Sequence, residues 1–171
     1  TNYDGTTLSN TTVYVRLTAG LSVGFYNGEN VTNSGGGAVD KTVSNDGEVT
    51  AVPVPTLNID PSVLSGYSYI FGNGPSSSQS FEISGTDLNG TDVSITAPTN
   101  YEVSLDNSTF GTSEVITTAH SNYDGTVLSN TSVYVRLKAG LSIGTYNGEN
   151  VKNSGGGASS HTVSNNGEVL D

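Results

Sequence analysis

The chain has 171 residues, of which 16 are acidic and only 5 are basic, and its formal net charge is −11. This charge excludes a nucleic-acid groove, because phosphate backbones are bound by clustered Lys and Arg side chains. The absence of Cys excludes a disulfide scaffold, a zinc-thiolate site and a thiol nucleophile, and no apolar run approaches the roughly 20 residues that span a bilayer.

Charged residues make up 12% of the chain, whereas in globular proteins they usually approach about a quarter. Thr, Ser, Asn and Gly are abundant instead. This composition is typical of an extracellular β protein whose solvent-exposed faces carry small polar side chains. Intrinsic disorder is the competing interpretation of an acidic chain of modest hydrophobicity, and the regular alternation of β-branched and aromatic residues argues against it.

The first 50 residues repeat near the end of the chain at an offset of 120. Asn2–Thr6 reappears as Asn122–Thr126, and Val13–Leu17 reappears as Val133–Leu137. The alignment continues without a gap, and roughly four positions in five are identical. Such identity indicates a recent duplication, and we expect the chain to be a segment of a longer tandem array.

The repeat predicts three parts of the chain. Residues 1–50 would be the C-terminal part of a preceding domain, residues 51–55 a linker, and residues 56–171 one complete domain. Alternating prolines, Pro53 and Pro55, favour an extended and stiff linker. Residues 1–50 should then supply the last three strands of a sandwich and present one apolar face, which other strands must cover. That face would comprise Val13, Val15, Leu17, Phe25 or Tyr26, Val31 and Val43.

Within the complete period the apolar residues alternate with polar ones, which predicts β-strands and no helix. Turns are expected at Asn73-Gly74, Asn89-Gly90, Asp124-Gly125 and Asn166-Gly167, whose residues tolerate positive φ angles. Seven or eight short strands in this length predict an immunoglobulin-like β-sandwich with Greek-key connections. The alternating pattern occurs at Leu57–Ile59, Tyr67–Phe71, Phe81–Ile83, Val93–Thr96, Tyr101–Leu105, Val115–Ile116, Val133–Leu137, Ile143–Val151 and Thr162–Val169.

Short motifs of one kind cover the whole period, from about Thr56 to Val169: Tyr67-Ser68-Tyr69, Gly74-Pro75-Ser76, Gln79 to Gly85, Val93 to Pro98, Tyr101 to Ser104, Val133 to Leu141 and Gly144 to Gly148. This pattern resembles a repeat of large secreted Bacteroidota cell-surface proteins. Such repeats occur in gliding-motility adhesins exported by the type IX system and as accessory modules of secreted hydrolases and nucleases, so the resemblance implies one of these two settings for this chain. It implies no catalytic residue, and the same module accompanies many partners.

The residues favour no enzyme active site. A serine triad would need His120 or His161, but the earlier copy has Lys41 in place of His161, so a surface histidine is the simpler interpretation. Paired carboxylates suited to glycosidic acid–base catalysis are expected to meet by chance on so acidic a surface. The acidic candidates are Asp60, Glu82, Asp87, Asp92, Glu102 and Glu114.

The best metal candidate is a calcium loop formed by Asp87, Asn89 and Asp92 around Gly90. Ca²⁺ prefers six to eight hard oxygen ligands on a tight turn. No bidentate Glu follows at the expected spacing, however, and an Asn-Gly hairpin turn accounts for the same residues. We therefore favour the turn, no required cofactor, and calcium as the alternative.

Two further groups bear on ligand binding. Arg16 and Arg136 lie mid-strand between apolar residues and would point outward or stack on an aromatic ring; an anion or sugar patch is the alternative. Tyrosines can stack on sugar rings, although core packing and strand-corner hydrogen bonds use most tyrosines in such sandwiches. The candidate tyrosines are Tyr67, Tyr69, Tyr101 and Tyr146.

The sequence therefore predicts a non-enzymatic structural or adhesive stalk on a bacterial cell surface, extracellular, with neighbouring repeats of the same polypeptide as its main partners. Each domain would add about 35–40 Å, since strands rise about 3.3 Å per residue. The acid excess would keep neighbouring stalks apart. The alternative is a carbohydrate-binding or spacer module of a secreted polysaccharide-degrading enzyme, with surface polysaccharide as the partner.

Overall fold

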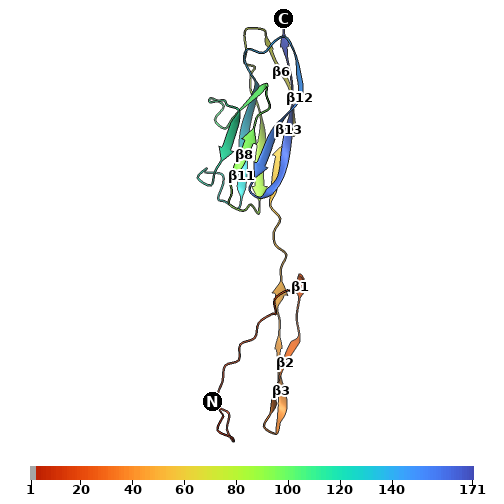
Figure 1. The fold of residues 1–171 in the computed structure, drawn as a ribbon, viewed down its shortest axis with the longest axis vertical. Coiled ribbons are helices and arrows are strands. Elements are labelled where there is room, and N and C mark those ends of the chain that lie inside the picture. Colours follow the sequence, from red (N-terminus) through yellow and green to blue (C-terminus); the bar gives the residue numbers. More distant parts are fainter. Residues whose placement is uncertain (1–2) are drawn as a thin grey trace. The chain divides into compact units, whose positions relative to one another are not determined.

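The computed structural model describes residues 3–171, and this part of the chain contains strands and turns without any helix. Accordingly, residues 3–171 include no helix long and apolar enough to cross a membrane. The chain divides into two compact units, one ending at Val52 and the other comprising Pro53–Asp171 (Figure 1). The all-β fold class predicted from the sequence is confirmed.

The second unit consists of two sheets. One sheet contains, in spatial order, β5 (Thr56–Asp60), β7 (Gln79–Thr86), β11 (Leu128–Leu137) and β9 (Tyr101–Ser104). The other contains β10 (Ser113–Ile116), β8 (Val93–Thr96), β12 (Gly144–Gly155), β13 (Ala158–Leu170) and β6 (Val63–Ile70). Neighbouring strands are antiparallel except β13 and β6, which are parallel.

The two sheets enclose one hydrophobic core, so this unit is a β-sandwich. On β11, alternate residues Val133, Val135 and Leu137 are fully buried, as the two-residue period of a strand requires. Ile95 on β8 and Val163 on β13 are buried from the other sheet and belong to the same core cluster. The alternation read from the sequence therefore identifies the inward face of these strands.

The chain enters and leaves the second unit at opposite ends (Figure 1). β5 leads directly into β6, and β6 runs parallel to β13, with Val63 beside Ser164 and Ile70 beside Leu170. Thr56 therefore lies near the end at which β13 begins, and Leu170 lies at the other end.

The first unit contains only short strands. β2 (Glu29–Gly35) and β3 (Ala38–Asn45) form a hairpin, and β1 (Gly24–Phe25) pairs with β4 (Glu48–Val49). Every Cα pair of these four strands recurs between β12 and β13 at an offset of 120. The duplication in the sequence is thus also a duplication of local structure, including the Gly-rich hairpin tip.

The prediction of a third strand in residues 1–50 is wrong at Val13–Leu17, which forms no strand. Its counterpart Val133–Leu137 lies in β11 and pairs with β7 on one side and β9 on the other. The described part of the first unit has no equivalent of β7 or β9. Alternation alone does not make a strand, because its backbone groups need partners.

The predicted turn at Asn166-Gly167 is also wrong, because both residues lie inside β13. The Asn166 side-chain oxygen accepts a hydrogen bond of 2.9 Å from the amide of Gly148 on the neighbouring strand. A Cβ at position 167 would lie 2.8 Å from the Cβ of Tyr67. Gly167 is therefore explained by close packing against Tyr67 rather than by a chain reversal.

Candidate functional site

The first unit exposes apolar side chains whose counterparts fill the core of the second unit. Leu8 is 70% exposed and its counterpart Leu128 is 1% exposed. Val43 on β3 is 56% exposed, whereas Val163 on β13 is fully buried. Identical residues thus meet water in one copy and a packed core in the other. Further residues exposed in this way are Tyr3, Val13, Val15 and Leu17.

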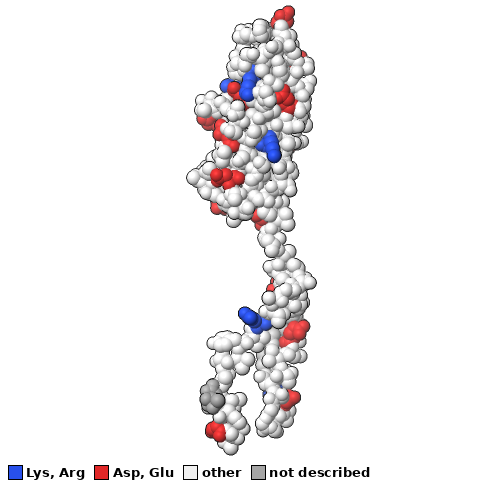
Figure 2. Space-filling view, in the orientation of Figure 1, with Lys and Arg blue, Asp and Glu red and all other residues white. Residues whose placement is uncertain are grey.

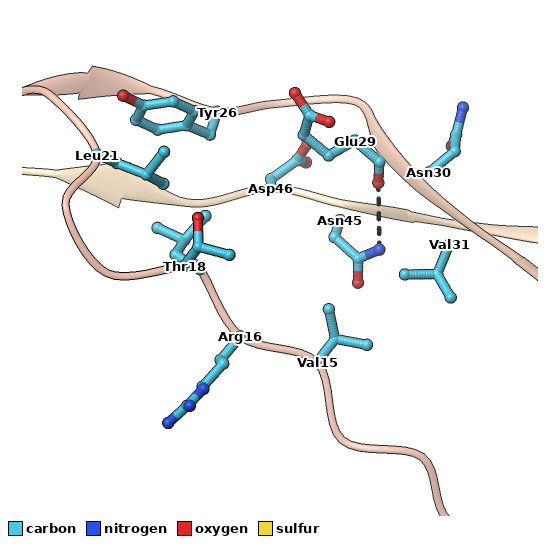
Figure 3. Close-up of a pocket in the computed structure, with 11 residues that line it drawn as sticks. Val15, Arg16, Thr18, Leu21, Tyr26, Glu29, Asn30, Val31, Asn45 and Asp46 are labelled. Carbon is cyan, nitrogen blue, oxygen red and sulfur yellow. Dashed lines mark hydrogen bonds between the residues drawn. The ribbon is translucent and has the colours of Figure 1, made fainter.

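Part of this apolar surface surrounds a cavity of about 500 Å³, here called the open pocket. It lies between the segment before β1 and the β2–β3 hairpin (Figure 3). In Figure 3 Tyr26 and Leu21 lie at one end of the pocket, and Val15 and Val31 lie at the other. The lining residues are Val15, Arg16, Leu17, Thr18, Leu21, Tyr26, Glu29, Asn30, Val31, Asn45 and Asp46.

The open pocket corresponds to part of the closed core of the second unit. The counterparts of Val15, Leu17 and Val31 are Val135, Leu137 and Val151, and all three are fully buried. The counterpart of Asn45 is Asn165, which is also fully buried. A cavity in one copy therefore replaces packed side chains in the other.

In the second unit two polar residues of the segment 56–120 reach the strands that correspond to the pocket wall. The Tyr101 hydroxyl donates a hydrogen bond of 2.7 Å to the backbone oxygen of Tyr146. The amide nitrogens of Asn100 donate to the Glu149 carboxylate, the side chain at 2.7 Å and the backbone at 3.2 Å. In the open pocket the corresponding acceptors belong to Tyr26 and Glu29, and no such donors approach the Glu29 carboxylate within the described residues.

A third contact joins the same two parts of the sandwich. The Tyr67 hydroxyl lies 3.4 Å from the side-chain oxygen of buried Asn165, and its ring meets that of Tyr101 edge-on at 5.3 Å. Burial raises the pKa values of both phenols far above their ordinary value of 10, with a smaller contribution from Tyr101 at Tyr67 and from the charge of Glu149 at Tyr101. Both hydroxyls therefore remain donors at any physiological pH.

Asn100, Glu149 and Asn165 were not among the residues singled out in the sequence. Glu149 and Asn165 are identical in both copies, as Glu29 and Asn45. That identity was the available signal, but it is shared by most positions of the repeat. Their roles depend on the pairing of strands distant in sequence, so only the structure distinguishes them.

The predicted calcium ligands lie in the loop between β7 and β8. Asn89 Oδ1 accepts hydrogen bonds from the backbone and side chain of Thr91 at 3.2 and 2.7 Å. Its backbone amide donates to the oxygen of Gly156 at 3.0 Å. Within residues 3–171, no three His, Cys, Asp or Glu side chains gather as a metal ion would require. The prediction of a hairpin turn is wrong, because β7 and β8 belong to different sheets and the loop that contains Asp87, Asn89 and Asp92 joins the two sheets. Calcium binding there stays a prediction.

Arg136 is engaged within the second unit. Its guanidinium forms an ion pair of 2.8 Å with Glu102 and lies 3.9 Å from the centre of the Phe110 ring. The predicted stacking on an aromatic ring is therefore present, and this side chain is not a free cation. Its counterpart Arg16 lines the open pocket, and Figure 3 shows its guanidinium pointing away from the cavity.

Three of the four candidate tyrosines, Tyr67, Tyr69 and Tyr101, are buried in the core. Tyr146 is half-buried, and its hydroxyl donates a hydrogen bond of 2.7 Å to the backbone oxygen of Ser142. Core packing and strand-corner hydrogen bonding, rather than sugar stacking, thus explain these four positions.

Two of the remaining catalytic candidates, Glu82 and His120, have structural contacts. The Ser132 hydroxyl donates to Glu82 at 2.6 Å, and His120 Nδ1 accepts from the backbone amide of Asn122 at 3.2 Å. His161 lies on β13 with its side chain exposed. Burial and the charge of Asp106 raise the pKa of Glu114. The prediction that the chain is not an enzyme rests on the sequence argument.

Comparison with known proteins identifies no relatives: no protein-family model matches the chain, and no curated protein matches it. The resemblance to secreted Bacteroidota repeats therefore stays a prediction that rests on the sequence motifs.

Proposed function

We propose that this chain is a non-enzymatic segment of a tandem-repeat stalk or filament of an adhesin on a bacterial cell surface. The observation that carries the proposal is the repetition of local structure. Residues 24–49 reproduce the strand register of residues 144–169 pair by pair. A chain that carries the same domain half twice is most simply a segment of an array of identical domains.

The arrangement of strands favours an immunoglobulin-like sandwich within this proposal. The sheet β5-β7-β11-β9 matches the A-B-E-D order, and β8, β12 and β13 match C, F and G. The Tyr146 hydrogen bond to Ser142 matches the tyrosine corner of such domains, and Tyr26 repeats it with Ser22 at 2.8 Å. One departure concerns β10, which pairs with β8, the strand that matches C. In this chain β10 follows β9, the strand that matches D, instead of coming directly after β8.

The placement of the chain ends fits a stalk. Because the second unit is entered at one end and left at the other (Figure 1), successive domains would follow one another end to end. The longest strand, β13, has 13 residues, which corresponds to about 43 Å at the usual rise per residue. Each domain would therefore contribute roughly 40 Å to the length of the array.

The surface favours a spacer over a nucleic-acid or sugar-binding module. On the face seen in Figure 2, basic side chains occur singly among acidic and uncharged ones. The net charge of −11 would make neighbouring stalks repel one another. The burial of Tyr67, Tyr69 and Tyr101 removes the main aromatic strip that the carbohydrate-binding alternative required.

The test is to isolate the parent polypeptide from its native source and to measure its mass, its peptides and its shape. A stalk predicts a polypeptide many times longer than this chain, near-identical tryptic peptides, labelling by a membrane-impermeant reagent on intact cells, and an axial repeat of about 40 Å by electron microscopy. A short polypeptide that joins this domain to an unrelated catalytic domain would overturn the stalk and support the accessory-module alternative. Binding of the purified chain to polysaccharides would support the same alternative.

A further inference from the structure

In the second unit, strands from the beginning and the end of the domain pair with each other. The chain enters this unit at Thr56, through β5 and β6, and leaves it at the end of β13, at the opposite end of the domain (Figure 1). β6 and β13 are parallel, from Val63 beside Ser164 to Ile70 beside Leu170. A pull on the two ends of the domain therefore draws β6 and β13 in opposite directions along their shared edge.

The parallel pairing decides how the hydrogen bonds between β6 and β13 carry such a force. The bonds of a parallel pair are spaced evenly along the strands. When the two strands are pulled from opposite ends, the force acts along the strands, so all the bonds are strained together and must break nearly at once. When they are pulled from the same end, the bonds break one after another. The first arrangement, called shear below, resists a larger force than the second, called peeling.

Backbone hydrogen bonds close both ends of the β6–β13 ladder. At one end the amide of Ser164 donates to the oxygen of Ser62 at 2.9 Å, and at the other the amide of Phe71 donates to the oxygen of Leu170 at 2.8 Å. The register is interrupted only at the bulge formed by Gly66. Because β13 also pairs with β12 along its other edge, sliding of β13 along its axis would break bonds on both sides.

Side chains and backbone groups of β6 are also fixed to the rest of the sandwich. Tyr69 is buried, and its hydroxyl donates a hydrogen bond of 2.7 Å to the backbone oxygen of Lys138. The same hydroxyl accepts a bond of 3.1 Å from the amide of Leu141. From β7, the side-chain amide of Gln79 donates to the backbone oxygen of Ser65 at 2.7 Å. Movement of β6 along its axis would break these contacts together with the ladder.

β5, through which the force enters, has a shorter ladder. It has five residues, pairs with β7 along one edge, and has no partner on its other edge among the described strands. β6 has eight residues. The longer β6–β13 ladder should therefore provide the main resistance, after β5 has detached.

We propose that the second unit is built to bear tension, and that the parallel pair of β6 with Ser164–Leu170 of β13 is a clamp that must shear before the domain extends. This role follows from contacts within residues 56–171 and needs nothing that precedes or follows them. The clamp would let the proposed stalk resist pulling, but it does not rest on the stalk function. The stalk is tested on the native polypeptide and the clamp on the purified chain, so either can fail without the other.

The first experiment compares shear with peeling in the same folded domain by single-molecule force spectroscopy. The natural chain has no cysteine, so handles can be attached at pairs of substituted positions, all three of which are exposed. V54C/D171C applies the force at the linker and at the end of β13, which is shear. F71C/D171C applies it at one end of the ladder, because Phe71 lies beside Leu170, and this is peeling.

We expect the unfolding force, measured at equal loading rates, to be several-fold higher in shear than in peeling. Complete unfolding should lengthen the chain by roughly 300–400 Å in either geometry, which identifies the event. Equal forces in the two geometries would overturn the clamp, and so would a lower force in shear.

The second experiment locates the resistance within the domain. Forced unfolding is governed by the unfolding rate rather than by equilibrium stability, so a change in the clamp should lower the force more than a change elsewhere of equal cost in stability. F71P removes the amide that binds Leu170, and F71A keeps this amide while losing the same side chain. Y69F removes only the hydroxyl that binds Lys138 and Leu141.

The controls are V133A on β11 and L57A on β5, because both side chains are buried and neither lies on β6 or β13. Every variant is pulled in shear through V54C/D171C, and its stability is measured separately by denaturant unfolding. F71P should lower the force relative to F71A. Y69F should lower it by a larger fraction, for the same lost stability, than V133A.

The clamp is overturned if the force simply follows the lost stability at all of these positions. It is also overturned if L57A lowers the force most, which would assign the resistance to the pairing of β5 with β7.

Discussion

Residues 3–50 and 123–170 are identical at roughly four positions in five, yet only the second copy is part of a closed sandwich. The hairpin register is the same in both copies, and so are the hydrogen bonds of Tyr26 to Ser22 and of Tyr146 to Ser142. Asp4 and Asp124 likewise accept the same backbone hydrogen bonds from the residues two and three positions later. The strand at Val133–Leu137 exists only where β7 and β9 flank it. The comparison shows which features depend on neighbours in sequence and which depend on distant strands.

The difference is greatest for the apolar side chains. Leu8 and Leu128 occupy equivalent positions and differ most clearly in exposure. The hydrophobic contribution scales with the area removed from water, so the same residue stabilises the second unit and contributes little in the first. Matched substitutions at equivalent positions therefore measure what the segment 56–120 adds.

The largest expected difference is between L128A and L8A. Replacing buried Leu128 should lower the free energy of unfolding of the second unit by about 2–5 kcal/mol, from lost burial and the cavity left behind. Replacing exposed Leu8 should change it by less than about 0.5 kcal/mol. Both are measured by denaturant unfolding followed by circular dichroism at low protein concentration. An equal loss in L8A would mean that the first unit is covered as the second unit is.

A second pair concerns glycines at the two hairpin tips. Gly155 and Gly35 have φ angles of 134° and 128°, so alanine is strained at both. A Cβ on Gly155 would also collide with the backbone of Asp92 and Val93, whereas a Cβ on Gly35 meets nothing within 4 Å. We expect G155A to destabilise the second unit by about 1–3 kcal/mol through overpacking.

The matched variant G35A should leave the thermal unfolding of the second unit unchanged, because its strain is confined to the first unit. Differential scanning calorimetry of both variants measures the unfolding temperature of the second unit in each. A G155A variant as stable as the unmodified chain would contradict the close approach of the β12–β13 tip to Asp92.

A smaller difference is expected for E149Q and E29Q. The Glu149 carboxylate accepts both amide hydrogen bonds from Asn100, and glutamine keeps only one acceptor oxygen. The loss should be about 0.5–1.5 kcal/mol, the usual net contribution of one hydrogen bond. E29Q should have no effect on the unfolding of the second unit. If E29Q costs as much as E149Q, Glu29 already has an equivalent partner in solution.

The sequence predicted most of the sandwich because alternation marks strands with one buried face, as at Val133–Leu137 and Val93–Thr96. It missed the first half of β6, where Ser65 and Gly66 interrupt the pattern. The turn predicted at Asn166-Gly167 was wrong because Asn-Gly is, in proteins generally, a strong signal for a tight hairpin turn. Here Gly167 allows the close approach of Tyr67, a contact between residues 100 positions apart that no local pattern reveals.

The candidate site was less predictable. The sequence predicted an apolar sheet face in residues 1–50; Val13, Val15 and Val43 are exposed, but Val13 and Val15 lie outside any strand. The polar partners of that face, Asn100 and Tyr101, lie in the segment without a second copy. Their role follows from the pairing of β9 with β11 and from the packing of the two sheets. Both involve residues far apart in sequence, so a local pattern does not reveal them.

The smallest expected effect concerns the Asp-centred turn, which should be the same in both copies. Asp124 Oδ1 accepts backbone hydrogen bonds from Val127 at 2.6 Å and Thr126 at 2.8 Å. Asp4 has the same bonds with Thr7 and Thr6 at the same lengths. These backbone bonds lower the pKa of both carboxyls below their ordinary value of 3.8.

Because the pKa of each folded carboxyl lies below its unfolded value, the ionised form stabilises the turn at neutral pH, and this contribution is lost as the pH falls through the lowered pKa. Titration of the carboxyl carbons by NMR should give depressed pKa values for both Asp4 and Asp124. The acid dependence of the unfolding of the second unit should decrease in D124N and stay unchanged in D4N. If the pKa is depressed at Asp124 but ordinary at Asp4, the turn forms only within the complete sandwich. The turn would then depend on distant strands and not on neighbours in sequence alone.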